Sequence, residues 1–207
     1  MYWAEFLTIA VAHLFAVASP GPDFAVVMRQ SVRGGTGVGI WTSLGIGAGI
    51  FLHITYCILG VAVLLSQSAA FFNGVKYAAA AYLLYLGLQS IKLSLRHSQE
   101  QGMTARDAVT EHGKAFILGF LTNGLNPKAT LFFLALFTVV IDPATPLTIQ
   151  IAYGVYLAVA TFAWFAMLSR MLGRQSVRDF LLRAGMWFER GMGLVLILLA
   201  IQIVIFI

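Results

Sequence analysis

Six long apolar blocks constrain this chain more than any other feature of its sequence. They are Ala4–Val27, Val38–Leu65, Val75–Leu93, Ala115–Ile141, Leu147–Leu168 and Gly185–Ile207. Each is long enough to cross a hydrocarbon core of about 30 Å, which takes roughly 20 helical residues. The blocks lack the strict alternation of barrel strands, and only helices or closed barrels satisfy the backbone in lipid. The sequence therefore predicts an all-α membrane protein with six transmembrane helices.

The few charged residues are distributed unevenly along the chain. Only 10% of its 207 residues are charged, whereas a soluble domain carries about a quarter. Eleven of the 13 Lys and Arg residues fall in the connections that follow the first, third and fifth blocks or at the block ends beside them. Because short loops rich in Lys and Arg stay in the cytoplasm, both termini are expected on the outer side of the membrane. The same distribution argues against nucleic-acid binding, although the net charge is +5.

The longest polar segment divides the chain into two similar parts. This segment, 96–114, is expected to be a cytoplasmic connection with a short helix near Thr104–Val109. It separates a first repeat, residues 1–95, from a second repeat, residues 115–207, and no separate soluble domain is evident. Each repeat holds an odd number of predicted helices, so the second must be inverted relative to the first. The chain is thus predicted to be one transmembrane domain built from two inverted three-helix repeats.

Proline and polar residues interrupt the first and the fourth apolar block. A proline inside a helix removes one backbone hydrogen bond and clashes with the preceding turn. The two interrupted segments are SPGPD, residues 19–23, and TNGLNPKA, residues 122–129. Paired interruptions in corresponding helices of two inverted halves indicate the substrate site of a transporter. The residues assigned to substrate binding or proton coupling are Ser19, Pro20, Gly21, Pro22, Asp23, Asn123, Asn126, Pro127 and Lys128.

Asp23 and Lys128 are the charged residues of these two interruptions. Ionisable residues inside membrane spans usually face a cavity and mark a substrate or ion pathway. Asp23 also suits the first turn of a helix that begins at Pro22, so a capping role stays open. Lys128 could instead extend its long stem toward the membrane surface. One alignment of the interruptions sets Asp23 on Lys128, and we expect Asn126 and Lys128 to approach Asp23 across the interface between the repeats.

Two features of the apolar blocks admit both a structural and a functional interpretation. Small residues recur at every fourth position in the second block, beginning at Gly35 and ending at Gly47. Such spacing lets helices approach closely, and it would also suit a surface along which another helix slides. His13 and His53 lie at membrane depth. Hydrogen-bonded packing is the favoured role for these histidines, and proton transfer is the alternative.

Four segments carry a resemblance to a known family. They are SPGPD, the glycine-rich second block after Arg29–Gly35, AAYLLYLGLQ in the third block, and GFLTNGLNPKATLFF in the fourth. In this order they resemble the LysE/RhtB family of amino-acid exporters, and within it the branch of homoserine and threonine exporters. The resemblance implies a carrier of the bacterial inner membrane that is driven by the proton or the membrane potential. It implies protons and threonine-like, homoserine-like or basic amino acids as its ligands.

The sequence argues against an enzyme. It has no HExxH motif, Asp23 has no second acid at its depth, and the single cysteine, Cys57, cannot form a CxxC pair. No cofactor or metal is expected, and the spacing of His97 and His112 matches no metal site. The alternative is an exporter of a metal or other small cation on a related architecture, although such cations would favour more acidic, His or Cys ligands. Assembly with further copies of the chain stays open.

Overall fold

The computed structural model describes the chain except for residues 1, 67–68, 96–110, 143, 173–174 and 207. Every regular element in the described part is a helix. The helices are α1 (Tyr2–Ala18), α2 (Pro22–Gly34), α3 (Thr36–Ser66), α4 (Ala69–Leu95), α5 (His112–Gly124), α6 (Pro127–Ala135), the π-helical turn η1 (Leu136–Val140), α7 (Leu147–Met171) and α8 (Gln175–Phe206). The prediction of an all-α fold is therefore confirmed. Most of the expected connection 96–114, including its short helix, lies outside the described residues.

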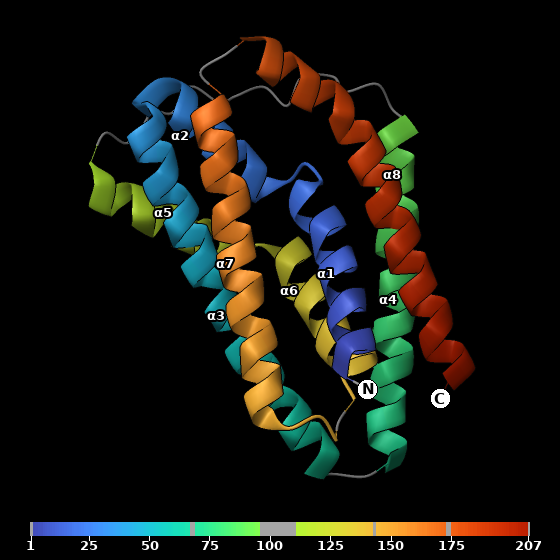
Figure 1. The fold of residues 1–207 in the computed structure, drawn as a ribbon. Coiled ribbons are helices and arrows are strands. Elements are labelled where there is room, and N and C mark those ends of the chain that lie inside the picture. The colour runs from blue at the N-terminus through green and yellow to red at the C-terminus, as the bar shows by residue number, and fades with distance from the viewer. Residues whose placement is uncertain (1, 67–68, 96–110, 143, 173–174, 207) are drawn as a thin grey trace.

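The long helices run side by side along the length of the molecule (Figure 1). Helix α3 packs against α5 and α7, and α4 packs against α8. The short helices α1 and α6 lie between these pairs, and the two chain termini lie at the same end of the bundle (Figure 1). An even number of crossings would place the termini on one side, as the charge distribution predicts.

Two helices in the described part are long and apolar enough to cross a membrane alone. They are Thr36–Gly60 and Leu147–Met171, with mean hydropathies of 1.6 and 1.8. Helices α1 and α2 meet the same test together, as one span bent by 54°. This helical membrane architecture agrees with the sequence, while the number of six spans and the inverted relation of the repeats remain predictions.

The first bend follows from the residues between α1 and α2. Pro20 has no N–H to continue α1, which ends at Ala18. Gly21 is extended, with φ −176° and ψ −172°, and Pro22 occupies the first position of α2. Proline is favoured there because its fixed φ already suits the helix. Asp23 thereby enters the first turn of α2, where the helix dipole favours a negative charge.

The second bend has its own cap. Helix α5 ends at Gly124, and Pro127 begins α6. Between them Asn126 is extended, and its Oδ1 accepts a hydrogen bond from the Lys128 N–H at 3.0 Å. A side-chain cap of this kind satisfies one of the backbone donors that every helix start leaves unpaired. Both interruptions predicted from the sequence are therefore breaks between separate helices.

The small residues of α3 serve close packing. A Cβ added at Gly45 would collide with the Phe116 carbonyl of α5, and one added at Gly119 would collide with the Thr42 carbonyl of α3. The two glycines therefore allow the backbones of α3 and α5 to cross in contact. At Gly39 the neighbouring side chain is Ser31 of α2. These contacts fit the packing interpretation of the small-residue repeat.

Glu5 fixes the start of α1 against the start of α7. Its carboxylate accepts hydrogen bonds from the Thr145 hydroxyl at 2.9 Å, the Tyr153 hydroxyl at 3.0 Å and the Asp142 N–H at 3.0 Å. Hydrogen bonds to a charged group are about twice as strong as those between neutral groups. This end of the first span is thus held to the chain segment that leads from η1 into α7.

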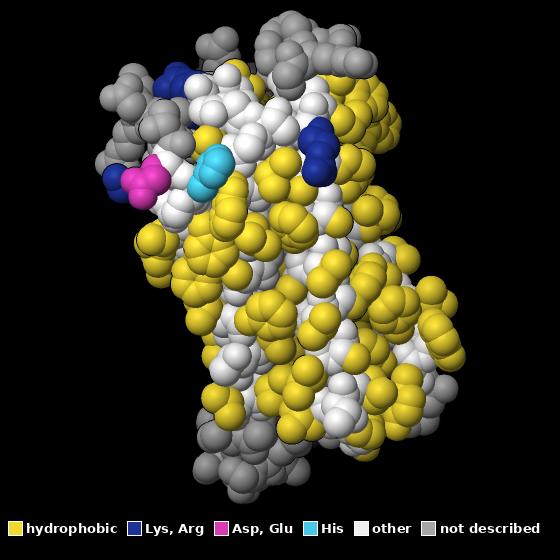
Figure 2. Space-filling model, turned by 60° about the vertical axis from the view of Figure 1, so that its left-hand side comes forward, with side chains coloured by type: hydrophobic (Ala, Val, Ile, Leu, Met, Phe, Trp, Pro, Cys, Tyr) yellow, Lys and Arg dark blue, Asp and Glu magenta, His cyan; other side chains and the backbone are white. Residues whose placement is uncertain are grey.

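The outer surface suits a lipid environment. Figure 2 shows hydrophobic side chains spread over one face, with the coloured charged and histidine side chains gathered toward one end. Exposed apolar side chains of α3 include Trp41, Phe51, Leu52 and Leu59. At the start of α5 the exposed Lys114 and Glu111 form an ion pair of 2.8 Å, and its hydrogen bond raises the pKa of Lys114. Apolar residues thus face outward along the bundle, as a bilayer requires.

Candidate functional site

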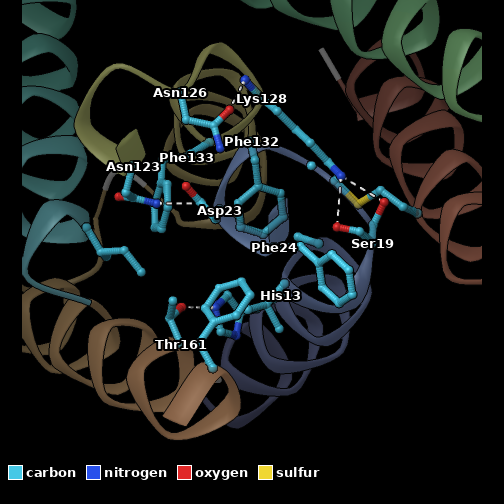
Figure 3. Close-up of a pocket in the computed structure, with 17 residues that line it drawn as sticks. His13, Ser19, Asp23, Phe24, Asn123, Asn126, Lys128, Phe132, Phe133 and Thr161 are labelled. Atoms are coloured by element: carbon cyan, nitrogen blue, oxygen red, sulfur yellow. Dashed lines mark hydrogen bonds between the residues drawn. The ribbon is translucent and has the colours of Figure 1, made fainter. Parts of the chain in front are cut away.

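The two helix breaks meet inside the bundle. Asn123, in the last turn of α5, donates from Nδ2 to Oδ2 of Asp23, in the first turn of α2, at 2.9 Å (Figure 3). The two residues are 100 positions apart in sequence. Asn123 is buried, and Asp23 is half-buried. The contact brings the interrupted spans of the two predicted repeats face to face.

Lys128 crosses from α6 to the end of α1. Its Nζ donates to the Ser19 hydroxyl at 2.7 Å and to the Pro20 carbonyl at 3.2 Å, and the Ser19 carbonyl lies at 3.4 Å (Figure 3). The carbonyls at a helix C-terminus carry partial negative charge and lack intrahelical partners. The ammonium therefore satisfies the backbone groups that the first break exposes. Its charge also interacts with the Asp23 carboxylate.

A cavity of about 50 Å³ lies where the breaks meet. Its wall carries the polar groups of the breaks and of His13 and Thr161, and the rest is largely apolar, with four phenylalanines. The polar lining residues are His13, Ser19, Asp23, Asn123, Asn126, Lys128 and Thr161, and the aromatic ones are Phe24, Phe132, Phe133 and Phe165. This volume has room for a few water molecules. A larger solute would require the walls to move apart.

Two acceptor atoms in the wall are buried and accept no hydrogen bond from the described residues. They are Oδ1 of Asp23 and Oδ1 of Asn123. An acceptor left unpaired in a protein interior costs free energy, about 1–3 kcal/mol, unless water or a ligand donates to it. Oδ1 of Asn123 lies against Gly49 of α3, so the oxygen that this pair presents to a donor entering the cavity is Oδ1 of Asp23.

Residues 14–206 match the sequence profile of the LysE type translocators. The chain belongs to this family. It is 26% identical to the threonine efflux protein of Escherichia coli (strain K12) over 184 residues, which are 89% of each chain. It is also 34% identical to the leucine efflux protein of Salmonella choleraesuis (strain SC-B67) over 149 residues, 71% of this chain and 66% of that one. No solved structure matches the chain.

Family membership makes this LysE type translocator a transporter of the membrane and not an enzyme. The resemblance read from the ordered motifs is therefore confirmed. The match begins at residue 14 and so includes both helix breaks. The site geometry and the family thus agree that the breaks belong to a transport protein.

The structure of the translocator brings together most of the residues that the sequence assigned to a site. Ser19, Gly21, Asp23, Asn123, Asn126 and Lys128 line the cavity. The three prolines do not; Pro20, Pro22 and Pro127 shape the chain around it. Lys128 was expected to approach Asp23, and the hydrogen bonds of its ammonium go to Ser19 and Pro20 of the same break. Asn126 caps α6 with the same side chain that faces the cavity.

Sequence analysis singled out His13 but did not predict that it forms the opposite wall of the cavity together with Thr161. Nε2 of His13 lies 2.8 Å from the Thr161 hydroxyl, and both residues are buried in the lining (Figure 3). His13 is hydrogen-bonded, as expected, but it also faces the same cavity as Asp23. Thr161 was missed because a single threonine in an apolar helix usually bonds to its own backbone and attracts no attention.

Proposed function

We propose that this translocator exports small amino acids across the bacterial inner membrane by secondary active transport, with the substrate bound between the two helix breaks. The observation that carries the proposal is the contact of Asn123 with Asp23 beside the Lys128 ammonium. It gathers groups of both charges around one cavity, as a zwitterion requires. The names of the relatives, threonine efflux and leucine efflux proteins, support an amino acid as the cargo.

The ammonium group of the substrate has partners at the first break. Oδ1 of Asp23 is buried and accepts nothing from the described residues. The Ser19 and Pro20 carbonyls already bind an ammonium, that of Lys128. A substrate ammonium would compete with Lys128 for these acceptors and would find the Asp23 oxygen beside them.

The carboxylate of the substrate has partners at the helix starts. The first backbone bond within α2 runs from Ala25 to Gly21, so the N–H groups of Asp23 and Phe24 precede it. Helix N-termini bind anions because their N–H groups and the dipole both favour negative charge. Lys128, displaced from the Ser19 and Pro20 carbonyls, would then pair with the carboxylate.

This exchange of partners would couple substrate binding to the conformational change of the transport cycle. In the structure Lys128 joins α6 to the end of α1, and Asn123 joins α5 to α2. A bound amino acid would replace both ties and free the two halves to rock about the site. Asp23 would then exchange a proton with one side, which couples export to the proton or membrane potential. Two inverted repeats would pair α3 with α7 and α4 with α8, as the structure does, but α5 packs more extensively on α3 than α1 does on α7.

A cation exporter has less support. Within the described residues, no group of three or more His, Cys, Asp or Glu side chains could hold a metal ion. The names of the relatives also point to amino acids.

Counterflow in proteoliposomes tests the proposal. Vesicles that contain the purified protein are loaded with one of the twenty amino acids, and uptake of the labelled compound is measured. We expect counterflow of at least one small amino acid and none of Mg²⁺, Mn²⁺ or Zn²⁺. Counterflow of a divalent cation without any amino acid would establish the alternative.

A further inference from the structure

His53 lies outside the cavity yet contacts the second helix break from α3. Its side chain is completely buried. Its Nε2 lies 3.0 Å from the carbonyl oxygen of Asn123, and its Nδ1 is hydrogen-bonded to the Tyr56 hydroxyl. A carbonyl only accepts, so Nε2 must carry the hydrogen. In the neutral ring Nδ1 is then the acceptor for the Tyr56 O–H. One tautomer thus satisfies both ring nitrogens.

The Asn123 carbonyl is the centre of the break. It accepts the Asn126 N–H at 2.9 Å in addition to the His53 N–H at 3.0 Å. A carbonyl oxygen has two lone pairs, so this one is fully used. Its side chain is the one that donates to Asp23. The same residue therefore joins α3 through its backbone and α2 through its amide.

His53 also supports the other side of the break. Its ring stacks on Phe133 of α6, with centroids 5.3 Å apart and an interplanar angle of 1°. One turn earlier on α3, a Cβ added at Gly49 would lie 2.8 Å from Oδ1 of Asn123. Residues four apart share one face of a helix. On this face of α3, Gly49 leaves room for the Asn123 side chain, and His53 donates a hydrogen bond to the Asn123 carbonyl.

We propose that His53 is a positioning residue, which holds the α5–α6 break in the geometry that lets Asn123 donate to Asp23. It touches neither the cavity nor the substrate, and it acts through the Asn123 backbone. The hydrogen bond by which His53 holds the Asn123 backbone does not depend on which compound the protein transports. Its effect on transport rests on the proposed function, because only then is Asp23 a substrate ligand.

Hydrogen–deuterium exchange of the reconstituted full chain tests the backbone role. His53→Phe keeps a ring to stack on Phe133 and removes the donor to Asn123. Amide exchange in the peptide that contains Leu125 and Asn126 should become about tenfold faster, since one hydrogen bond at the break is lost. Exchange around Ser19–Ala25, at the other break, should not change. Unchanged exchange at Leu125 and Asn126 would overturn the proposal whatever the protein transports.

Transport kinetics test the consequence for the site. With labelled threonine and leucine as probes, His53→Phe should raise the KM of counterflow about tenfold, whereas His53→Gln, which restores an N–H donor, should recover most of it. In a chain that already carries Asn123→Ala, His53→Phe should cause little further loss, because the group it positions is gone. If His53→Phe raised the KM as much in the Asn123→Ala chain as in the unaltered chain, or if His53→Gln did not lower the KM again, His53 would serve packing alone.

A matched control is available in the same chain. His112 stacks on Trp41 at the start of α5, with ring centroids 5.7 Å apart, and it does not line the cavity. His112→Phe should preserve both the exchange pattern and the KM. If the unaltered chain shows no counterflow of any amino acid, the proposed function fails, and the exchange experiment still decides the role of His53.

Discussion

The two helix breaks differ in where their backbone groups find partners. At the first break, the carbonyls of Ser19 and Pro20 accept from an ammonium of α6, and α2 starts without a side-chain cap. At the second break, Asn126 caps α6 from within the break, and His53 of α3 secures the carbonyl of Asn123. The first break therefore depends on an ammonium from α6, which the proposed substrate would displace, whereas the second break is held by Asn126 and by His53.

This difference assigns the breaks separate tasks. The second break is expected to keep its geometry, because His53 of α3 and the Asn126 cap satisfy its backbone groups. The first break carries the carboxylate of Asp23 and the acceptors that hold Lys128. A ligand that brings its own ammonium changes the first break more than the second. The asymmetry predicts that loss of the groups that meet at the first break, Asp23 and Lys128, affects transport, and that loss of the Asn126 cap at the second break mainly affects stability.

The largest effect is expected from Asp23→Asn. The substitution keeps the size of the side chain and an oxygen that accepts from Asn123, but it removes the charge that would bind a substrate ammonium or a proton. Hydrogen bonds to charged groups contribute about 1.5–3 kcal/mol, so uphill export should fall by roughly ten- to a hundredfold or more. Asp142→Asn, at an exposed carboxylate that bonds to the Ala144 N–H, serves as the control. Uphill export at the normal rate would reduce Asp23 to a residue of the helix start.

Lys128→Met separates the two breaks directly. It removes the ammonium from Ser19 and Pro20 but leaves the backbone N–H that Asn126 caps. We expect faster amide exchange around Ser19, an intact second break, and counterflow reduced about tenfold, from the loss of one charged partner.

Lys92→Met, at an exposed lysine in the last turn of α4, is the matched control for this substitution. Equal acceleration of exchange at both breaks in the Lys128 variant would contradict the difference described above.

The sequence indicated the breaks because their signals are local. Two prolines around Gly21, one at Pro127, and charges inside apolar blocks are visible without any knowledge of packing. The partners across the bundle are not local. They depend on how α1, α3, α5 and α6 are placed relative to one another. Examples are the hydrogen bond of Lys128 to Ser19, that of His53 to Asn123, and the close crossing of helices at Gly45. A regular spacing of glycines predicts that helices approach closely, but it does not indicate which helices do so.

Asn126→Ala tests the internal support of the second break. Loss of a side-chain cap costs about 1 kcal/mol, within a range of roughly 0.5–2 kcal/mol. We expect a lower thermal unfolding temperature in detergent and a smaller loss of counterflow than Lys128→Met causes. Asn126→Ser should restore part of the stability, because its hydroxyl oxygen can accept from the Lys128 N–H without adding a charge beside Asp23. A transport loss as large as that of Lys128→Met, with stability unchanged, would place Asn126 in direct contact with the substrate.

The smallest effect is expected on the wall that faces the breaks. Thr161→Val keeps the shape of the side chain and removes the hydroxyl that bonds to His13 at 2.8 Å. This wall then becomes more apolar, so counterflow of leucine relative to threonine should rise about three- to tenfold, the range that a single lost hydrogen bond allows. Thr42→Val is the matched control, because Thr42 is equally buried but bonds to the Val38 carbonyl within α3 and does not line the cavity. Initial rates with both amino acids in the same vesicles give the ratio without correction for protein content. A ratio that stays constant in Thr161→Val would show that the wall formed by His13 and Thr161 does not contact the substrate side chain. Selectivity would then lie with the apolar part of the lining, which includes Phe24, Phe132 and Phe165.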